Sequence, residues 1–445
     1  MSAPAPARPA APSYAAVLRA PHARRTFAAA LTGRFSYGVA PLAILLSVNR
    51  ATGSYAVSGV VMSLFGGAAV FLMPLRASLA DRYGARRALL PMATLYAVLL
   101  CVLAALAWRP GAPAVLIGAA AALAGACAPP LGPVMRALWS ELVTDRQLRH
   151  RAYSLDGVAE ELLFVSGPVL VGVLVTWAPP ASGILLGALL VVAGTAAFVT
   201  SPAMTGPRPR SGRTRLGGVP GLTAPVVVAA GAGLALSGVD LLVTAYVAQR
   251  SDDTALVPWI LGALSVGSVL GGLANGAIDW RRSARARLAW FATGLGLVSA
   301  AAGLAPGLWT LTAAMLCTGA FVAPTLTTAY LLADELSPEA TRTRAGAWVN
   351  MAVNGGSSTG ALLTGALIGH LPLPLCFALT GAASLTTAGV AAAVRPGGAP
   401  VTGAGVSGAP ADGSGTPGEP AVRQPEGVSV TGPRASGASA DGVGA

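Results

Sequence analysis

Residues 77–87 read ASLADRYGARR and follow directly on the second of a series of long apolar stretches. The carboxylate of Asp81, at the end of that stretch, can accept hydrogen bonds from the backbone N–H groups that open a neighbouring helix, or pair with Arg82 or Arg86. Such contacts would hold helix ends together at one face of the molecule. The alternative is that these arginines only mark the side of a membrane on which the loop lies.

The composition around this loop excludes a water-soluble enzyme. Of 445 residues, 54% are hydrophobic and 10% are charged, whereas soluble domains carry about 25% charged residues. A span needs about 20 apolar residues, so roughly 390 residues hold about twelve transmembrane helices. Backbone polar groups must be satisfied within lipid, which makes each span a helix. We therefore expect an all-α polytopic membrane protein.

Apolar stretches and the polar breaks between them define the expected spans. We predict helices at 27–46, 55–75, 89–107, 114–135, 152–177, 183–200, 223–247, 255–278, 288–305, 308–332, 345–371 and 375–394.

All 29 basic residues are arginine, and they are unevenly distributed between alternate loops. With the N-terminus taken as inside, the outer loops hold only Arg50, Arg109 and Arg250. The inner segments hold the clusters at 76–87, 146–151, 208–215, 281–287 and 342–344. Loops rich in arginine stay in the cytoplasm, so we expect a multi-pass protein of the cytoplasmic (inner) membrane with both termini in the cytoplasm.

The same pattern predicts five regions. These are a cytoplasmic N-terminal segment at 1–25, a six-helix bundle at 26–200, a cytoplasmic linker at 201–222, a second six-helix bundle at 223–395 and a tail at 396–445. The linker is rich in Pro, Gly and Arg, which is typical of a flexible connection. The tail consists largely of Gly, Ala, Ser, Pro and Val without an aromatic residue, so we expect it to be disordered.

The chain contains an internal repeat with an offset of 193–194 residues. Offset 194 aligns 79–81 (LAD) with 273–275 (LAN) and Pro130 with Pro324, and offset 193 aligns Gly167 and Gly172 with Gly360 and Gly365. A parallel duplication of six helices gives two pseudo-symmetric bundles related by an axis along the membrane normal. Such bundles can rock about a central site and expose it alternately to each side of the membrane.

With these features the chain resembles a twelve-helix transporter of the major facilitator superfamily over about residues 20–395. Its loop at 77–87 is similar to the superfamily signature GxLaDRxGRR, with Ala77 for the first glycine and Ala85 for a basic residue. The resemblance implies a gating loop formed by Asp81, Arg82, Gly84, Arg86 and Arg87, with Asn275 replacing the acid in the second copy. It also implies that Asp81 contacts the start of the span 345–371, near Arg344 and Ala345.

Two charged residues lie alone within expected spans, where ionisable groups are costly and mark functional sites by default. Asp240 could couple transport to protons or balance a cationic substrate, or it could be solvated near the outer mouth. Arg34 could hold an anion or a carboxylate, or its side chain could reach the cytoplasmic headgroups. The resemblance implies that the first, fourth, seventh and tenth spans line the cavity, which favours a site role for both.

Three carboxylates, Asp156, Glu160 and Glu161, fall in the first turns expected for the span 152–177. Asp156 and Glu160 are four residues apart and share a face of the helix. They could complement the helix N-terminus or pair with Arg136 and Arg34 in a structural charge network. Alternatively, Glu160 or Glu161 could relay protons or contact substrate.

The same span carries Gly167, Pro168 and Gly172, in a stretch resembling the superfamily's antiporter motif gxxxGPxxGG, with Leu163 and Val171 replacing two of its glycines. The resemblance implies export, and small residues with a proline let the helix bend and pack closely. In the span 345–371, Asn350 and Asn354 could line the cavity, or the small residues around them could serve packing.

We therefore expect a secondary active transporter that moves a small organic compound by alternating access, by proton-coupled efflux. The alternative is an uptake symporter for a sugar, organic acid or other nutrient. A Walker sequence cannot exist without lysine, no clustered ligand set predicts a metal or cofactor, and no nucleophile–base pair predicts an enzyme. The expected partners are a small-molecule substrate, protons and the lipid bilayer, with no nucleic acid and a functional monomer.

Overall fold

The computed structural model describes residues 13–204, 221–250 and 256–393. Most of the predicted linker and the whole predicted tail lie outside the described residues, as do the first 12 residues of the N-terminal segment. Within the described ranges every long element is a helix, which confirms the all-α fold class.

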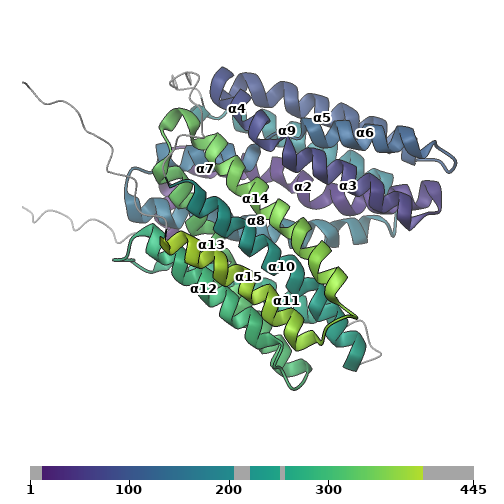
Figure 1. Ribbon diagram of the computed structural model, residues 1–445. Helices are drawn as coiled ribbons and strands as arrows, with labels where there is room; N and C mark the ends of the chain where they lie inside the picture. Colours follow the sequence, from purple (N-terminus) through teal and green to yellow (C-terminus); the bar gives the residue numbers. More distant parts are fainter. Residues whose placement is uncertain (1–12, 205–220, 251–255, 394–445) are drawn as a thin grey trace, which may run out of the picture. The chain divides into compact units, whose positions relative to one another are not determined.

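The helices fall into two sets, which we call the N-half and the C-half (Figure 1). The N-half consists of α1 (Tyr14–Arg19), α2 (Ala23–Thr52), α3 (Tyr55–Phe71), α4 (Met73–Tyr83), α5 (Ala85–Ala107), α6 (Ala114–Cys127), α7 (Leu131–Leu142), α8 (Arg146–Leu174) and α9 (Ala181–Val199). The C-half consists of α10 (Thr223–Arg250), α11 (Leu256–Ala277), α12 (Ala284–Ala302), α13 (Leu308–Leu336), α14 (Arg342–Leu367) and α15 (Leu373–Ala393).

Two predicted spans of the N-half are each divided into two helices. The helices α3 and α4 meet at a bend of 40°, and α6 and α7 are separated by residues 128–130, which include two prolines. Proline lacks a backbone donor and ends or kinks a helix, which accounts for the second break. The short helix α1, which the apolar pattern does not predict, precedes the first span.

By length and composition, nine helices of the described residues can span a membrane, or ten if α3 and α4 form one bent span. The remaining two of the predicted twelve are α12 and α14. Their polar residues, such as Arg285 and Arg287 in α12 and Asn350 and Asn354 in α14, lower their apolar character. Polar residues of this kind within a span face protein or a polar pathway rather than lipid.

Equivalent helices pack together in the two halves. The pairs α2–α9, α2–α8, α3–α6 and α5–α9 of the N-half recur in the C-half as α10–α15, α10–α14, α11–α13 and α12–α15. In Figure 1, α14 runs beside α10 and α12 beside α15. The internal repeat of the sequence is therefore accompanied by a repeat of the packing.

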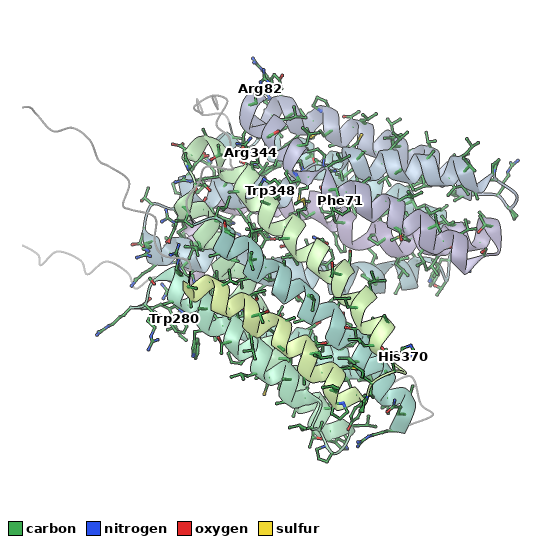
Figure 2. The ribbon with its side chains drawn as sticks, viewed as in Figure 1. Phe71, Arg82, Trp280, Arg344, Trp348 and His370 are labelled. Carbon is green, nitrogen blue, oxygen red and sulfur yellow. The ribbon has the colours of Figure 1, made fainter. Side chains whose placement is uncertain are left out.

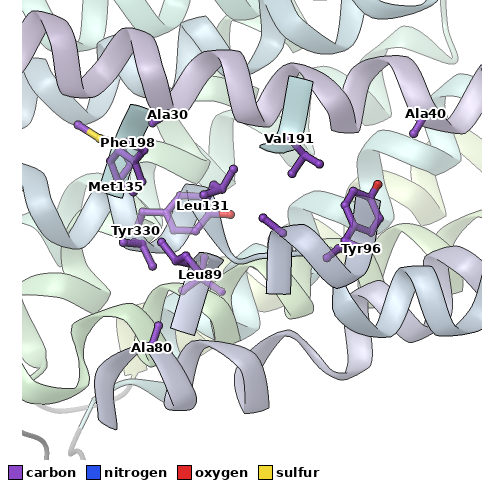
Figure 3. Packing of buried hydrophobic residues seen from close by; sticks show 14 of the residues in the cluster. Ala30, Ala40, Ala80, Leu89, Tyr96, Leu131, Met135, Val191, Phe198 and Tyr330 are labelled. Carbon is purple, nitrogen blue, oxygen red and sulfur yellow. The ribbon is translucent and has the colours of Figure 1, made fainter. Parts of the chain in front are cut away.

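The largest group of buried apolar side chains lies mainly in the N-half and extends into the C-half. Figure 3 shows Leu131, Met135 and Phe198 in the same cluster as Tyr330 of α13. Much of this core is alanine, because helices in lipid associate through close contact of small residues rather than through the hydrophobic effect.

Two ends of the molecule differ in their side chains. One, which we call the arginine-rich end, carries the arginine groups at 82–87, 146–151, 281–287 and 342–344; Figure 2 shows Arg82, Trp280 and Arg344 towards it and His370 away from it. At the opposite ends of helices, Trp177 and Trp309 are 87% and 89% exposed, and Trp108 and Trp259 are exposed as well. Exposed tryptophans are typical of a membrane–water interface.

Candidate functional site

Four charged side chains form a closed network inside the N-half. In it Arg34 of α2 lies 2.7 Å from Asp156 and 3.1 Å from Glu160, both on α8. From α7, Arg136 lies 3.0 Å from Asp156 and also pairs with Glu160. Each arginine therefore contacts both carboxylates. Burying two cations costs far less when two anions satisfy them in this way.

The helix that carries the two acids begins earlier than the sequence analysis predicts. The helix α8 starts at Arg146, where Asp145 caps it by accepting a hydrogen bond of 2.7 Å from the N–H of Leu148. The expectation that Asp156 lies in the first turns is therefore wrong, because a capping aspartate and polar first turns extend the helix beyond its apolar part. Asp156 lies in the helix interior with 0% exposure.

Burial decides between the two interpretations of Arg34. Its side chain is 2% exposed, so the guanidinium does not reach the lipid headgroups. It is held by carboxylates that the sequence analysis names as possible partners. Gly132 of α7 lies close to both arginines: a Cβ there would be in ordinary van der Waals contact, 3.6 Å from Arg136 Nη1 and 3.8 Å from Arg34 Nε.

A polar chain connects this network to the C-half. The guanidinium carbon of Arg136 lies 3.8 Å from the ring centre of Tyr330 in α13, which is a cation–π contact. Asn350 of α14 donates to the Tyr330 hydroxyl at 3.2 Å, and Asn354 donates to Asn350 Oδ1 at 3.0 Å. Both predicted asparagines thus lie next to the network, joined to it by a tyrosine that the sequence analysis does not name.

Two further carboxylates, Glu161 and Asp240, belong to opposite halves and interact electrostatically. The negative charge of Glu161 in α8 acts on Asp240 in α10, and the Glu161 side chain hydrogen-bonds Ser265 of α11. Neither acid forms an ion pair with a cation of the described residues. Asp240 is partly buried. Asp240 thus interacts electrostatically with one of the acids named for the span 152–177, and it is not among the carboxylates that pair with Arg34.

The loop at 77–87 lies at the arginine-rich end. Asp81 Oδ2 accepts a hydrogen bond of 3.1 Å from the backbone N–H of Arg344, and its carboxylate also bonds the side chain of Thr343. This is the position on α14 that the resemblance implies. An anion at a helix start satisfies orphan N–H groups and the helix dipole, and here it links α4 of the N-half to the C-half.

The other residues of the loop line an open cavity of about 1030 Å³ between the two halves. Arg82, Arg86 and Arg87 are exposed there, and Gly84 separates α4 from α5 with a positive φ of 84°. The counterpart of Asp81 in the repeat, Asn275, is 2% exposed, and its side-chain atoms have no hydrogen-bond partner among the described residues. The two copies of the loop are therefore not equivalent.

Further polar contacts join the halves at the arginine-rich end. They are Tyr14 Oη to the carbonyl of Leu273 (2.5 Å), Arg342 Nη1 to Ser140 Oγ (3.0 Å), Arg287 Nη1 to His150 Nε2 (3.0 Å), Arg151 Nη2 to Asp279 (3.2 Å) and Arg146 Nε to Glu335 (3.3 Å). Among the described residues, no hydrogen bond or ion pair joins the halves at the opposite end. Apart from the Glu161–Ser265 hydrogen bond and the Arg136–Tyr330 contact, the polar contacts between the halves are therefore concentrated at the arginine-rich end.

The stretch with Gly167, Pro168 and Gly172 in α8 contains one glycine that allows close helix packing. A Cβ on Gly167 would collide with the backbone of Gly38 in α2, whereas Gly172 has nothing within 4 Å. Pro168 lies inside the helix and is exposed. The close approach of α8 to α2 therefore depends on Gly167, and it lies within the N-half.

One buried cation was assigned to a loop by the sequence analysis and lies instead within a helix. Arg76 of α4 is 4% exposed, and it donates to the carbonyl of Gly125 at 2.7 Å and to that of Ala69. These carbonyls lie near the two helix breaks of the N-half, where backbone acceptors lack the next turn. Among the described residues, no group of three His, Cys, Asp or Glu side chains could hold a metal ion.

Comparison with known proteins agrees with this architecture. A family model of the Major Facilitator Superfamily matches residues 26–299 and 227–420. The chain therefore belongs to the Major Facilitator Superfamily and is a multi-pass membrane protein with the fold of its transporters. No curated protein sequence matches the chain.

Several solved structures share the fold at low sequence identity. The human organic anion transporter MFSD10 is 16% identical with a TM-score of 0.65, covering 83% of this chain and 99% of its own. A bacterial homologue of the iron transporter ferroportin, in its outward-facing state, is 15% identical with a TM-score of 0.65, covering 83% and 97%. The E. coli fucose:proton symporter FucP is 16% identical with a TM-score of 0.60, covering 82% and 98%.

Proposed function

We propose that the chain is a proton-coupled secondary transporter that exports a small organic compound across the cytoplasmic membrane and works as a monomer. The observation that carries the proposal is a set of two partly buried carboxylates from opposite halves, Glu161 and Asp240, which interact electrostatically and form no ion pair among the described residues. Membership of a transporter superfamily and the absence of a lysine for a Walker sequence support an ion gradient as the energy source.

The physical link between protons and rocking is charge repulsion. When both carboxylates are ionised, the halves repel each other at this point, and protonation of one removes the repulsion. Two carboxylates that interact electrostatically titrate as a pair. Proton binding would thus favour the approach of α8 to α10 and proton release would favour their separation, so each proton transferred changes the balance between the two states of the transporter.

The neighbouring network would serve as the fixed counterpart of this pair. Arg34 and Arg136 are held by Asp156 and Glu160 on the N-half side, and Tyr330 and Asn350 extend it to the C-half. A substrate bound between the halves would contact this chain of donors and acceptors. Contacts that change when the halves separate give the differential affinity that alternating access requires.

The gating role of the arginine-rich end rests on the interhalf contacts. Asp81 bonds the start of α14, and breaking this contact must accompany any opening at that end. The cytoplasmic location of this end follows from the arginine distribution. In this arrangement a substrate would reach the central site from the opposite, outer end.

Uptake by symport is the second candidate. The structural neighbours include the fucose:proton symporter FucP and the proton:xylose symporter XylE, so the fold is compatible with either direction. The stretch of α8 with Gly167, Pro168 and Gly172 favours export, because it resembles the antiporter motif of the superfamily. The proteoliposome experiment described next distinguishes export from uptake.

The test uses purified protein in proteoliposomes with an imposed pH gradient. Labelled probes would be a lipophilic cation (tetraphenylphosphonium), an organic anion (benzoate) and the sugars xylose and fucose. Antiport predicts accumulation of a probe in vesicles that are acidic inside, and symport predicts it in vesicles that are acidic outside. Asp240→Asn should abolish accumulation driven by the gradient but retain exchange of labelled for unlabelled probe.

Glu339→Gln is the matched control, because it removes one exposed carboxylate at the arginine-rich end. We expect it to accumulate probe like the unmodified protein. If Asp240→Asn retained gradient-driven accumulation of a transported probe, the coupling role of this carboxylate would be wrong.

A further inference from the structure

A small notch lies on the C-half at the arginine-rich end, between the end of α11 and the first turns of α12. It has a volume of about 190 Å³ and is lined by Trp280, Arg282, Arg287 and Trp290. Figure 2 shows Trp280 at this end of the molecule. Pockets that enclose a whole small molecule measure about 300–1,000 Å³, so the notch suits one compact group whose remainder lies outside it.

The notch contains positive charge without a matching anion. Arg287 is 5% exposed and contacts His150 Nε2 at 3.0 Å through Nη1, while its buried Nε has no hydrogen-bond partner. Among the described residues, no carboxylate lies within 4.0 Å of Arg287 or Arg282. Arg287 is thus contacted by His150 and lies 5.8 Å from the ring centre of Trp280, but neither contact supplies a negative charge. The two arginines together can therefore accept an anion.

The nearby carboxylates are already paired with other arginines. Asp279, next to Trp280, lies 3.2 Å from Arg151. Glu335, whose charge reaches Arg287, lies 3.3 Å from Arg146. Neither is free to neutralise the notch, so an anion from outside the protein is the remaining partner for Arg282 and Arg287.

The apolar side of the notch opens to the lipid-facing surface of α12. The rings of Trp280 and Trp290 are 6.0 Å apart between centroids. Trp290 is 52% exposed, and Leu297, seven residues further and on the same face, is 55% exposed. An exposed apolar strip therefore leads from the arginines towards the middle of the membrane, and tryptophans lie at the level of the headgroups.

We propose that this notch binds the phosphate of an anionic phospholipid, with Arg282 and Arg287 holding the phosphate and the acyl chains lying along Trp290 and Leu297. Basic pockets beside transmembrane helices on the cytoplasmic side accept such headgroups. A lipid phosphate is favoured over free phosphate because a lipid has acyl chains that can cover the apolar strip, whereas a soluble ion leaves the strip uncovered. Because Arg287 also contacts His150 of α8, the bound lipid would stabilise the joined arrangement of the halves at this end.

Native mass spectrometry of the full chain, titrated with phosphatidylglycerol, would test the site. Arg282→Gln should weaken the tightest bound phosphatidylglycerol roughly five-fold, since one arginine near an anionic surface contributes about that factor. Trp290→Ala should weaken it as well. Arg281→Gln is the matched control, because it removes the same charge from an exposed arginine that does not line the notch; it should leave the tight site unchanged.

Three results would overturn the proposal. One is an equal loss for Arg281→Gln and Arg282→Gln, and a second is equal binding of phosphatidylcholine and phosphatidylglycerol at this site. The third is displacement of the lipid by millimolar inorganic phosphate, which would assign the notch to a soluble anion. Thermal unfolding of each variant without added lipid shows whether the change affects folding, and Arg282 is exposed enough for this variant to fold.

Discussion

The N-half and the C-half share their packing and differ in their chemistry. Gly167 of the N-half and its counterpart Gly360 of the C-half both lie against helix backbone within their own half. Gly167 contacts α2, and Gly360 contacts α10. Gly172 and its counterpart Gly365 both face open space. The positions that set how closely the helices approach are therefore the same in both copies.

The four charged positions of the buried network have no charged counterpart. Offset 194 pairs Arg34 with Val228 and Arg136 with Tyr330, and offset 193 pairs Asp156 with Val349 and Glu160 with Val353. The N-half thus carries the four-residue network, and the C-half has valines and a tyrosine at the matching positions. Helix packing constrains both copies equally, whereas a buried ion network is needed once, and a second copy would add only desolvation cost.

The breaks in the helices follow the same division. The N-half interrupts α3/α4 and α6/α7, and Arg76 donates to carbonyls at both places. The equivalent C-half helices α11 and α13 are continuous, and offset 194 replaces Arg76 with Leu270, which is 57% exposed. A buried arginine is thus present where backbone acceptors are released and absent where helices are intact.

The largest effect should come from the ion network. Asp156→Asn leaves Arg34 and Arg136 in place with a neutral partner, and removing one member of a buried ion network should cost about 3–5 kcal/mol of unfolding free energy. Denaturant titration in detergent micelles measures it. Glu335→Gln, which breaks a pair with the exposed Arg146, is the control and should cost less than about 1 kcal/mol. Equal losses would show that the network is not a buried unit.

The shared glycines should behave alike in both halves. Gly167→Ala and Gly360→Ala each place a Cβ against backbone, and we expect each to cost about 3 kcal/mol through overpacking. Gly172→Ala and Gly365→Ala should cost nothing or stabilise by about 0.5 kcal/mol through helix propensity. The same unfolding titration compares all four. A large difference between the two members of a pair would contradict the equivalence of the halves.

Replacing Arg76 should lower the free energy of unfolding, whereas replacing Leu270 should leave it nearly unchanged. Arg76→Met leaves carbonyls near the helix breaks without a donor, and we expect a loss of about 2 kcal/mol. Leu270→Met, at an exposed position, should remain within about 0.5 kcal/mol. Amide exchange around residues 69–76 and 125–130 should increase in the arginine variant alone. Unchanged exchange there would remove Arg76 from its assigned role.

The smallest effect should come from the link between the halves. Tyr330→Phe keeps the ring beneath Arg136 and loses the hydrogen bond from Asn350, so we expect about 1 kcal/mol. The exposed Tyr83→Phe serves as the control. Transport of a probe by the Tyr330→Phe variant should slow more than its stability falls, because this contact joins the halves. If the Tyr330→Phe variant transported the probe at the normal rate, the Tyr330 hydroxyl would have no role in transport and the residue would serve packing alone.

The candidate site was only partly accessible to sequence reasoning. The four members of the network were named from their occurrence within apolar stretches, because charge in lipid is rare enough to be noticed. Tyr330 was missed, since a tyrosine in an apolar helix is unremarkable; its alignment with Arg136 at offset 194 is the signal that could have found it. Arg76 was missed because its neighbours Arg82, Arg86 and Arg87 made it look like part of a loop.

By itself the sequence determined the all-helical class, the repeat and the end at which arginine accumulates, since these follow from apolar length and from the short-range rules of insertion into lipid. The tertiary structure alone decided which charges meet. Arg34 and Asp156 are separated by 122 positions, yet lie 2.7 Å apart. Glu161 interacts electrostatically with Asp240 and forms no ion pair with an arginine among the described residues. Which side chains meet across two helices depends on how each helix is rotated about its axis and how closely the helices approach. Both are set by the combined packing of side chains that lie far apart in the chain.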